Sequence, residues 1–207
     1  MERGNTKQDI LAAALDLFSV NGFEGTSLSM IAEAVGIRKA SLYSHFDSKQ
    51  AILDALVENV LEQYNRRSLF ARTDPTALFG EGEQPMTAEG AAELIRQQLR
   101  YILHDPYIRK ARKMLTIEQF RNQELARLQT KQNYTDVLNF FTGLMDRLTR
   151  QGVLRKEDPR IMAAQFCLPV TVWINLCDRE PERETEVMEL VGDHVRQFFR
   201  VYGPEDE

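Results

Sequence analysis

The chain of 207 residues is poor in the side chains that most often carry catalysis or bind metals. It has two cysteines, three histidines and one tryptophan. His45, His104 and His194 lie far apart in the sequence, and no HExxH, GxSxG or CxxC pattern is present. The acids lie mainly on the polar faces of expected amphipathic helices. We therefore expect a chain that is not an enzyme and that needs no cofactor and no metal.

Long apolar runs are also scarce, which argues against export and against a membrane span. The opening residues, MERGNTKQDI, are polar and carry no apolar signal region. The longest apolar stretch, Ile161 to Cys177, is broken by polar residues and is short for a bilayer. Cys167 and Cys177 lie about 15 Å apart along one expected helix, too far for a disulfide. These features predict a cytoplasmic protein.

Positive charge is in the minority, because 26 lysines and arginines face 31 aspartates and glutamates, for a net charge of −5. A nucleic-acid binder of this composition cannot depend on overall attraction and needs a local basic patch. The hydrophobic content of 43% is sufficient for a sizeable core in one or two domains.

What the sequence does contain is a pair of short helical patterns joined by a glycine. Leu28, Ile31, Ala32 and Val35 fall at i, i+3, i+4 and i+7, one apolar stripe of about two turns. Gly36 is placed to end that helix in the left-handed conformation. A second helix is expected from 38 to 46. The arrangement is typical of a helix-turn-helix, although helix pairs with glycine turns also occur in plain bundles.

The flanking residues complete a three-helix head. The first helix is predicted by its apolar stripe, which comprises Ile10, Leu11, Ala14, Leu15, Leu17 and Phe18. Gly22 is expected to close this helix, so that Phe23 packs back on Phe18. Ser27 is expected to cap the next helix.

Residues 12–52, AAALDLFSVNGFEGTSLSMIAEAVGIRKASLYSHFDSKQAI, resemble the TetR family of bacterial transcriptional repressors almost position by position. The resemblance implies an all-α fold, with an N-terminal three-helix helix-turn-helix head on a C-terminal helical bundle that binds a ligand and dimerises. It places a DNA-binding domain at residues 1–50 and an effector-binding and dimerisation domain at residues 51–207.

The predicted DNA-binding residues are Ser27, Arg38, Lys39, Ala40, Ser41, Tyr43, Ser44, His45 and Lys49. The resemblance places the residue types at Lys39, Ser41, Tyr43 and His45 on or beside the groove-facing surface, and the Lys49 type on a phosphate. Arg38 departs from the family pattern, which often has a small hydroxyl residue there to cap the recognition helix. Each residue has a plainer alternative, as a solvated lysine, a half-buried tyrosine or a surface histidine.

Beyond Lys49 the pattern is helical throughout. A fourth helix is predicted at about 48–71, with Asp47 and Gln50 as a possible capping box. Residues 72–87 are rich in proline, glycine and acids, and are predicted to form a loop. Further helices are expected at 88–104, 106–119, 122–151, 159–177 and 182–202, two of them beginning at Asp105-Pro106 and Asp158-Pro159.

The last two helices predict a homodimer, because the helix at 159–177 is apolar nearly all round and the final helix has a broad apolar stripe. Two such helices could pair with their copies in a four-helix interface, and two linked heads could read a palindromic operator. The alternative is that they complete a monomeric core.

The resemblance also implies a small effector, for which apolar or aromatic chemistry is expected. The residues expected to line its pocket interrupt apolar helix faces: Tyr101, Met114, Gln119, Phe120, Tyr134, Phe141, Gln165, Pro169, Trp173 and Asn175. Pro169 is expected to free the carbonyl of Gln165 and to kink its helix. Two other interpretations stay open: an activator, and a helical sensor or adaptor whose head binds a protein rather than DNA.

Overall fold

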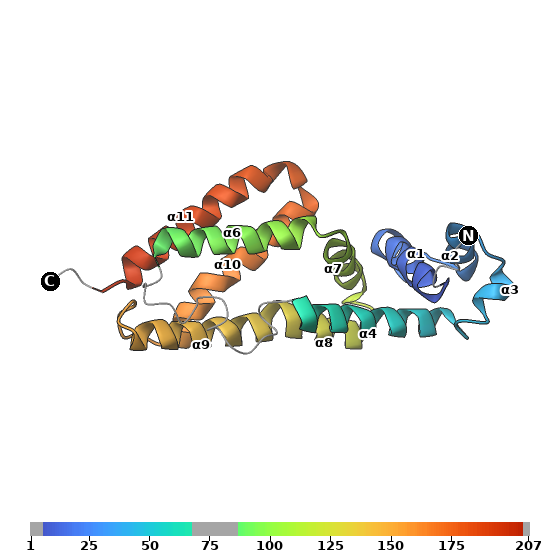
Figure 1. Ribbon diagram of the computed structural model, residues 1–207, viewed down its shortest axis with the longest axis horizontal. Helices are drawn as coiled ribbons and strands as arrows, with labels where there is room; N and C mark the ends of the chain where they lie inside the picture. Colours follow the sequence, from blue (N-terminus) through green and yellow to red (C-terminus); the bar gives the residue numbers. More distant parts are fainter. Residues whose placement is uncertain (1–5, 68–86, 205–207) are drawn as a thin grey trace. The chain divides into compact units, whose positions relative to one another are not determined.

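The computed structural model describes residues 6–67 and 87–204, and all regular secondary structure within these ranges is helical. The chain divides into two compact units, drawn together in Figure 1. The first contains residues 1–68 and 106–129, and the second contains residues 69–105 and 130–207. The predicted all-α fold is confirmed. The predicted loop at 72–87 lies, apart from Thr87, outside the described residues.

The first unit begins with four helices, α1 (Thr6–Asn21), α2 (Leu28–Val35), α3 (Lys39–Leu42) and α4 (Lys49–Arg67). Two helices from later in the chain, α7 (Pro106–Glu118) and α8 (Gln123–Thr130), belong to the same unit, and α7 packs along α1. Their side chains share one core, which includes Ile10, Ala14, Phe18, Ile31, Leu42, Leu56, Met114 and Leu125. By packing, therefore, α4, α7 and α8 belong to the same unit as the head. The predicted boundary at residue 50 instead separates the residues by their expected function.

The helix ends in the head form as their residues predict. The Ser27 hydroxyl accepts a hydrogen bond from the Met30 N–H at 3.2 Å and caps α2. Gly36 has φ +74°, and the N–H of Ile37 donates to the Ala32 carbonyl at 2.9 Å. The rings of Phe18 and Phe23 lie 5.5 Å apart between centroids, so the predicted contact after α1 is confirmed.

Two local predictions in the first unit are wrong. The expected helix at 38–46 is α only from Lys39 to Leu42, and the chain continues as turns to Phe46. The cap of α4 is Ser48 rather than Asp47, because the Ser48 hydroxyl accepts from the Ala51 N–H at 3.0 Å. Serine is an equally good cap, so composition alone does not separate these adjacent positions.

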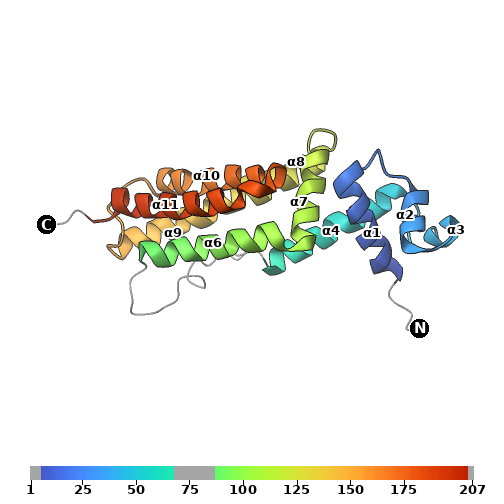
Figure 2. The ribbon, with the colours of Figure 1, turned by 90° about the horizontal axis from the view of Figure 1, so that it is seen from above.

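The second unit consists of α6 (Ala88–His104), α9 (Asp136–Arg150), α10 (Pro159–Arg179) and α11 (Glu184–Tyr202), with a short 3-10 turn at Pro181–Arg183. Helix α9 packs against α10 and α11 packs against α6 (Figures 1 and 2). The main core of the second unit contains Val137, Phe140, Phe141, Leu144, Met162, Phe166, Val195 and Phe198. A cluster with Leu99, Leu103, Cys177, Val187 and Val191 extends this packing.

The start of α10 follows its prediction closely. Asp158 accepts hydrogen bonds from the N–H groups of Arg160 and Ile161 at 2.8 and 3.3 Å, and Pro159 is the first helical residue. Helix α10 runs through Pro169 without ending. The helix expected at 122–151 is helical without a break from Gln123 to Arg150, but a π-helical turn at Lys131–Thr135, which was not predicted, divides it into α8 and α9.

Candidate nucleic-acid interface

The segment predicted to read DNA is exposed except at its two anchor residues. Leu42 and Phe46 are buried in the first unit's core. The other predicted contact residues of this segment are exposed: Arg38, Lys39, Ala40, Ser41, Tyr43, Ser44 and His45. Figure 1 shows α3 and the turns after it at the edge of the head, away from α1. The structure therefore presents these side chains together on one surface.

The chemistry of this surface is mixed polar and cationic. Tyr43 is 46% exposed, so part of its side chain is open to a partner. The Ser44 hydroxyl donates to the Ser41 carbonyl at 2.6 Å, which leaves the Ser44 oxygen as an acceptor. Arg38 stands at the N-cap of α3 and makes no capping hydrogen bond, as its side chain predicts. Arg38 and Lys39 thus bring positive charge to the start of the recognition helix.

Lys49 has a structural role that the sequence did not indicate. Its ammonium nitrogen lies 2.7 Å from the Phe23 carbonyl oxygen and 3.0 Å from that of Thr26, and 4.2 Å from the centroid of the Phe23 ring. These contacts hold the turn that precedes α2. An ammonium has three donors, so a single N–H is left for the predicted phosphate contact, which stays a prediction.

Glu118, at the end of α7, reaches the other side of the same turn. Its carboxylate oxygen accepts a hydrogen bond from the Phe23 backbone N–H at 2.8 Å, and its side chain is buried with only 3% of the residue exposed. Sequence reasoning missed this residue, although a signal was present. Ala111, Met114, Leu115 and Glu118 fall at i, i+3, i+4 and i+7, which places an acid on the buried stripe of α7.

The ten predicted pocket residues are divided between the two units. Met114, Gln119 and Phe120 belong to the first unit and the other seven to the second. Phe120 is 88% exposed and Tyr134 is 46% exposed, so neither is in the environment of a cavity wall. Their assignment to an effector site stays a prediction.

The remaining eight take varied positions. Met114 and Phe141 are core residues. Gln165 and Asn175 are exposed, and the Gln165 side chain accepts a hydrogen bond from the Tyr202 hydroxyl. Gln119 and Pro169 are half-buried. Trp173 meets His194 edge to face, at 5.4 Å between ring centroids. The Tyr101 hydroxyl is buried and makes no hydrogen bond within the described part of the chain.

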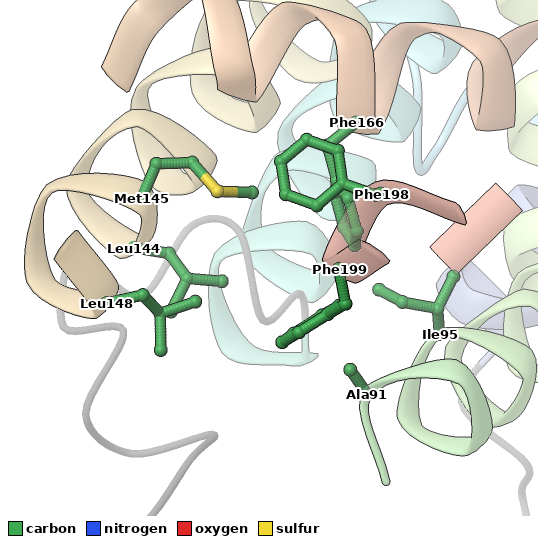
Figure 3. A pocket seen from close by; sticks show the side chains of 8 residues that line it. All are labelled: Ala91, Ile95, Leu144, Met145, Leu148, Phe166, Phe198 and Phe199. Atoms are coloured by element: carbon green, nitrogen blue, oxygen red, sulfur yellow. The ribbon is translucent and has the colours of Figure 1, made fainter. Parts of the chain in front are cut away.

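The second unit contains a small cavity at another place, lined entirely by apolar side chains. Figure 3 shows the lining residues, which come from all four helices of this unit: Ala91, Ile95, Leu144, Met145, Leu148, Phe166, Phe198 and Phe199. Its volume is about 10 Å³, the space of roughly one water molecule. None of these residues was predicted, because apolar residues at helical spacing look the same in the sequence whether they fill a core or border a cavity.

Four aliphatic side chains on α10 and α11 are exposed in the single chain. Ile161 and Val172 on α10 are 54% and 62% exposed, and Leu190 and Val201 on α11 are 38% and 41% exposed. We call these four residues the open face. Within residues 6–67 and 87–204, α10 is also the one helix long and apolar enough to cross a membrane, with 28% of its apolar window buried.

A helix-turn-helix head with an exposed recognition segment, in one chain with a separate helical unit, defines the class of DNA-binding transcriptional regulators. Residues 10–56 match the family of bacterial regulatory proteins called the tetR family. Residues 90–204, more than half of the chain, match the C-terminal domain of AefR-like transcriptional repressors. The chain belongs to the TetR family.

Individual relatives agree with this assignment. The IcaR negative regulator of the biofilm operon icaADBC in Staphylococcus aureus (strain Newman) is 46% identical over 59 residues, 28% of this chain and 32% of IcaR. The chain thus matches about a third of the length of this curated relative. A crystal structure of a TetR-family regulator from Mesorhizobium loti MAFF303099 has a TM-score of 0.70 and 22% identity, covering 99% of this chain and 100% of that one.

A second solved structure is that of a complex with a small molecule. The complex of SmeT with triclosan has a TM-score of 0.64 and 20% identity, covering 98% of this chain and 93% of that one. SmeT is the repressor of the multidrug efflux pump SmeDEF in Stenotrophomonas maltophilia. At these identities, both structural likenesses establish the fold.

Proposed function

We propose that this chain is a ligand-responsive transcriptional repressor of the cytoplasm, which binds a palindromic operator as a homodimer and is released by a small apolar or aromatic effector. The observation that carries this proposal is the exposed segment Arg38–His45, anchored on the core by Leu42 inside a head of the TetR family. Exposed polar side chains on a rigidly anchored helix are what base reading in a major groove requires.

The residues of this surface divide by chemistry into positioning and reading groups. Arg38 and Lys39 supply cations for phosphate oxygens, and Tyr43 supplies a hydroxyl on a flat ring that can lie on the backbone. Ser41, Ser44 and His45 provide donors and acceptors for base edges. Because few cations are involved and the chain carries a net charge of −5, binding should depend on salt only modestly.

The open face of α10 and α11 supports a homodimer through these two helices. It places four aliphatic side chains in water, each between 38% and 62% exposed. A second copy related by a two-fold axis would cover the same face on both chains. Light scattering should give a dimer at micromolar concentration, and Val172→Glu should shift it towards a monomer with unchanged helix content. A wild-type monomer would contradict this interface.

The second unit is the proposed effector site. Its cavity is apolar on all sides, which fits a ligand of apolar or aromatic chemistry, and SmeT in its triclosan complex has a similar fold. At about 10 Å³ the cavity is far smaller than an ordinary ligand site of roughly 300 Å³, so an effector must select a more open state. Repression would then be relieved as the population moves to a state that does not fit the operator.

The experiment that tests DNA reading uses substitutions in the exposed segment with matched controls elsewhere. Lys39→Ala and Tyr43→Ala should weaken binding to the selected DNA by at least tenfold and leave the melting temperature unchanged. The controls are Lys156→Ala, at an exposed lysine of the second unit, and Tyr134→Ala, at a tyrosine that is 46% exposed like Tyr43. Equal DNA binding by all four variants would favour an adaptor whose head binds a protein.

A further inference from the structure

Within the described residues, three helices end at a glycine in the left-handed conformation, and one of them ends differently from the other two. Gly22, Gly36 and Gly152 have φ of +72°, +74° and +73°. After Gly36, the Ile37 N–H donates back to the Ala32 carbonyl at 2.9 Å, and after Gly152 the Val153 N–H donates to the Leu148 carbonyl at 3.0 Å. Both are the hydrogen bond of a Schellman ending, which satisfies the helix from within.

At the end of α1 the corresponding N–H belongs to Phe23, and its acceptor comes from another helix. The Phe23 N–H donates to the Glu118 carboxylate at 2.8 Å, across 95 positions of sequence. The Phe18 carbonyl, which would be its partner in a Schellman ending, accepts from the Gly22 N–H at 3.0 Å. The turn after α1 is therefore completed by α7, and without Glu118 this N–H would lose its acceptor.

The peptide groups around Phe23 are held by two opposite charges from two helices. Glu118 of α7 accepts from the N–H of Phe23, and the Lys49 ammonium of α4 donates to the Phe23 carbonyl at 2.7 Å. Hydrogen bonds to charged groups are roughly twice as strong as neutral ones. The same ammonium bonds the carbonyl of Thr26, one residue before the cap of α2. The turn that these charges hold thus leads directly into the helix-turn-helix.

The approach of the carboxylate depends on the glycine. A Cβ atom at Gly22 would lie 2.9 Å from the Glu118 Oε1 atom and 3.1 Å from Cγ2 of Ile117. A Cβ atom at Gly36 or Gly152 would meet nothing within 4 Å. Gly22 therefore has two functions, the left-handed turn and the space for the acid, whereas the other two glycines have the first alone.

We propose that Glu118 is a positioning residue for DNA reading, which holds the α1–α2 turn to α7 and so makes operator affinity depend on the position of α7. This inference deepens the proposed function and rests on it. The residue acts through Phe23 and the helices that follow, and it does not contact DNA. Any change that withdraws the end of α7 from the head would release the turn and loosen α2 and α3.

The test compares Glu118→Ala with one conservative variant and one control. Glu118→Gln keeps an oxygen that can accept from Phe23 and should preserve most of the operator affinity. Asp16→Ala removes another contact between α1 and α7, the exposed ion pair of Asp16 with Lys110, and leaves the turn untouched. We expect Glu118→Ala to weaken operator binding on the order of tenfold, within the usual range of coupling between sites, and Asp16→Ala to have little effect.

Hydrogen exchange of the free protein separates the possible failures. In Glu118→Ala we expect faster amide exchange over residues 22–46 and unchanged exchange in α9 to α11, whereas Asp16→Ala should leave both regions unchanged. Wild-type exchange over residues 22–46 in Glu118→Ala would overturn the inference, whether or not DNA binds. Wild-type operator affinity in a folded Glu118→Ala, or equal losses in Glu118→Ala and Asp16→Ala, would also overturn it. A wild-type protein that retains no DNA would instead refute the proposed function.

Discussion

The three glycines that end helices in the left-handed conformation give a prediction with its own internal controls. We consider alanine at Gly22, Gly36 and Gly152, whose φ values lie within 2° of one another. Alanine in this conformation costs about 1–2 kcal/mol at any of the three positions. At Gly36 and Gly152 the new methyl group meets nothing within 4 Å, so this strain is the whole expected loss of stability.

At Gly22 a second cost is added. The new methyl group would lie 2.9 Å from the Glu118 oxygen, so the carboxylate must shift, and we expect this shift to break its hydrogen bond with the Phe23 N–H. The Phe23 N–H lies in a part-buried site, and a donor left there without a partner costs about 1–3 kcal/mol. We therefore expect Gly22→Ala to lower the free energy of unfolding by about 2–5 kcal/mol in total, the sum of that cost and the strain of the left-handed conformation.

Urea unfolding followed by circular dichroism measures these three losses directly. The same substitution in a Glu118→Ala background completes a double-mutant cycle, in which Gly22→Ala should cost no more than Gly36→Ala, because the clashing carboxylate is gone. The reasoning is refuted if Gly22→Ala and Gly152→Ala cost the same in the wild-type chain, or if the extra cost at Gly22 survives the removal of Glu118.

Two further predictions concern the second unit. Burial raises the pKa of Cys167 from 9.0 to about 11, so its thiol should stay unreactive towards a disulfide reagent at pH 8 until urea unfolds the chain; prompt reaction of the folded protein would contradict this. The pKa of Cys167 is higher in the folded chain than in the unfolded chain. Its protonated thiol therefore contributes its full share to the free energy of unfolding below pH 9, and this contribution is lost as the pH rises through about 11. In α11, a glycine replaced by alanine would usually raise the free energy of unfolding by about 1 kcal/mol. We expect Gly192→Ala to show almost none of this gain, because the new Cβ would overlap the Arg96 guanidinium. That guanidinium is held in place by its Nε, which donates to the Met188 carbonyl at 3.1 Å. The full gain should return in an Arg96→Ala background, as measured by urea unfolding.

The parts of the fold that depend on local spacing could be predicted from the sequence. The stripe of α1, the cap at Ser27 and the left-handed residue at Gly36 each need only a few neighbouring residues, and all three are present in the structure. The start of α10 at Asp158 and Pro159 likewise depends only on neighbouring residues and was predicted. Local hydrogen bonding and helical periodicity decide these features before any tertiary contact forms.

Features that depend on contacts between distant residues could not be predicted in the same way. Lys49 looks like any exposed lysine in the sequence, and its bonds to Phe23 and Thr26 form only when α4 packs on the head. Glu118 lies 95 positions along the sequence from Phe23, whose N–H donates a hydrogen bond to it. The cavity of the second unit is lined by apolar residues from four helices. These are the residue types of an ordinary core, so the sequence does not mark them as cavity residues.

Selection of genomic DNA fragments on the purified protein, followed by sequencing of the retained fragments, is the most direct test of the central claim. The account predicts a shared palindrome with two half-sites about one helical turn apart, retained by the wild-type chain and lost with Lys39→Ala. No enriched motif at low salt would contradict operator binding and favour a head that binds another protein.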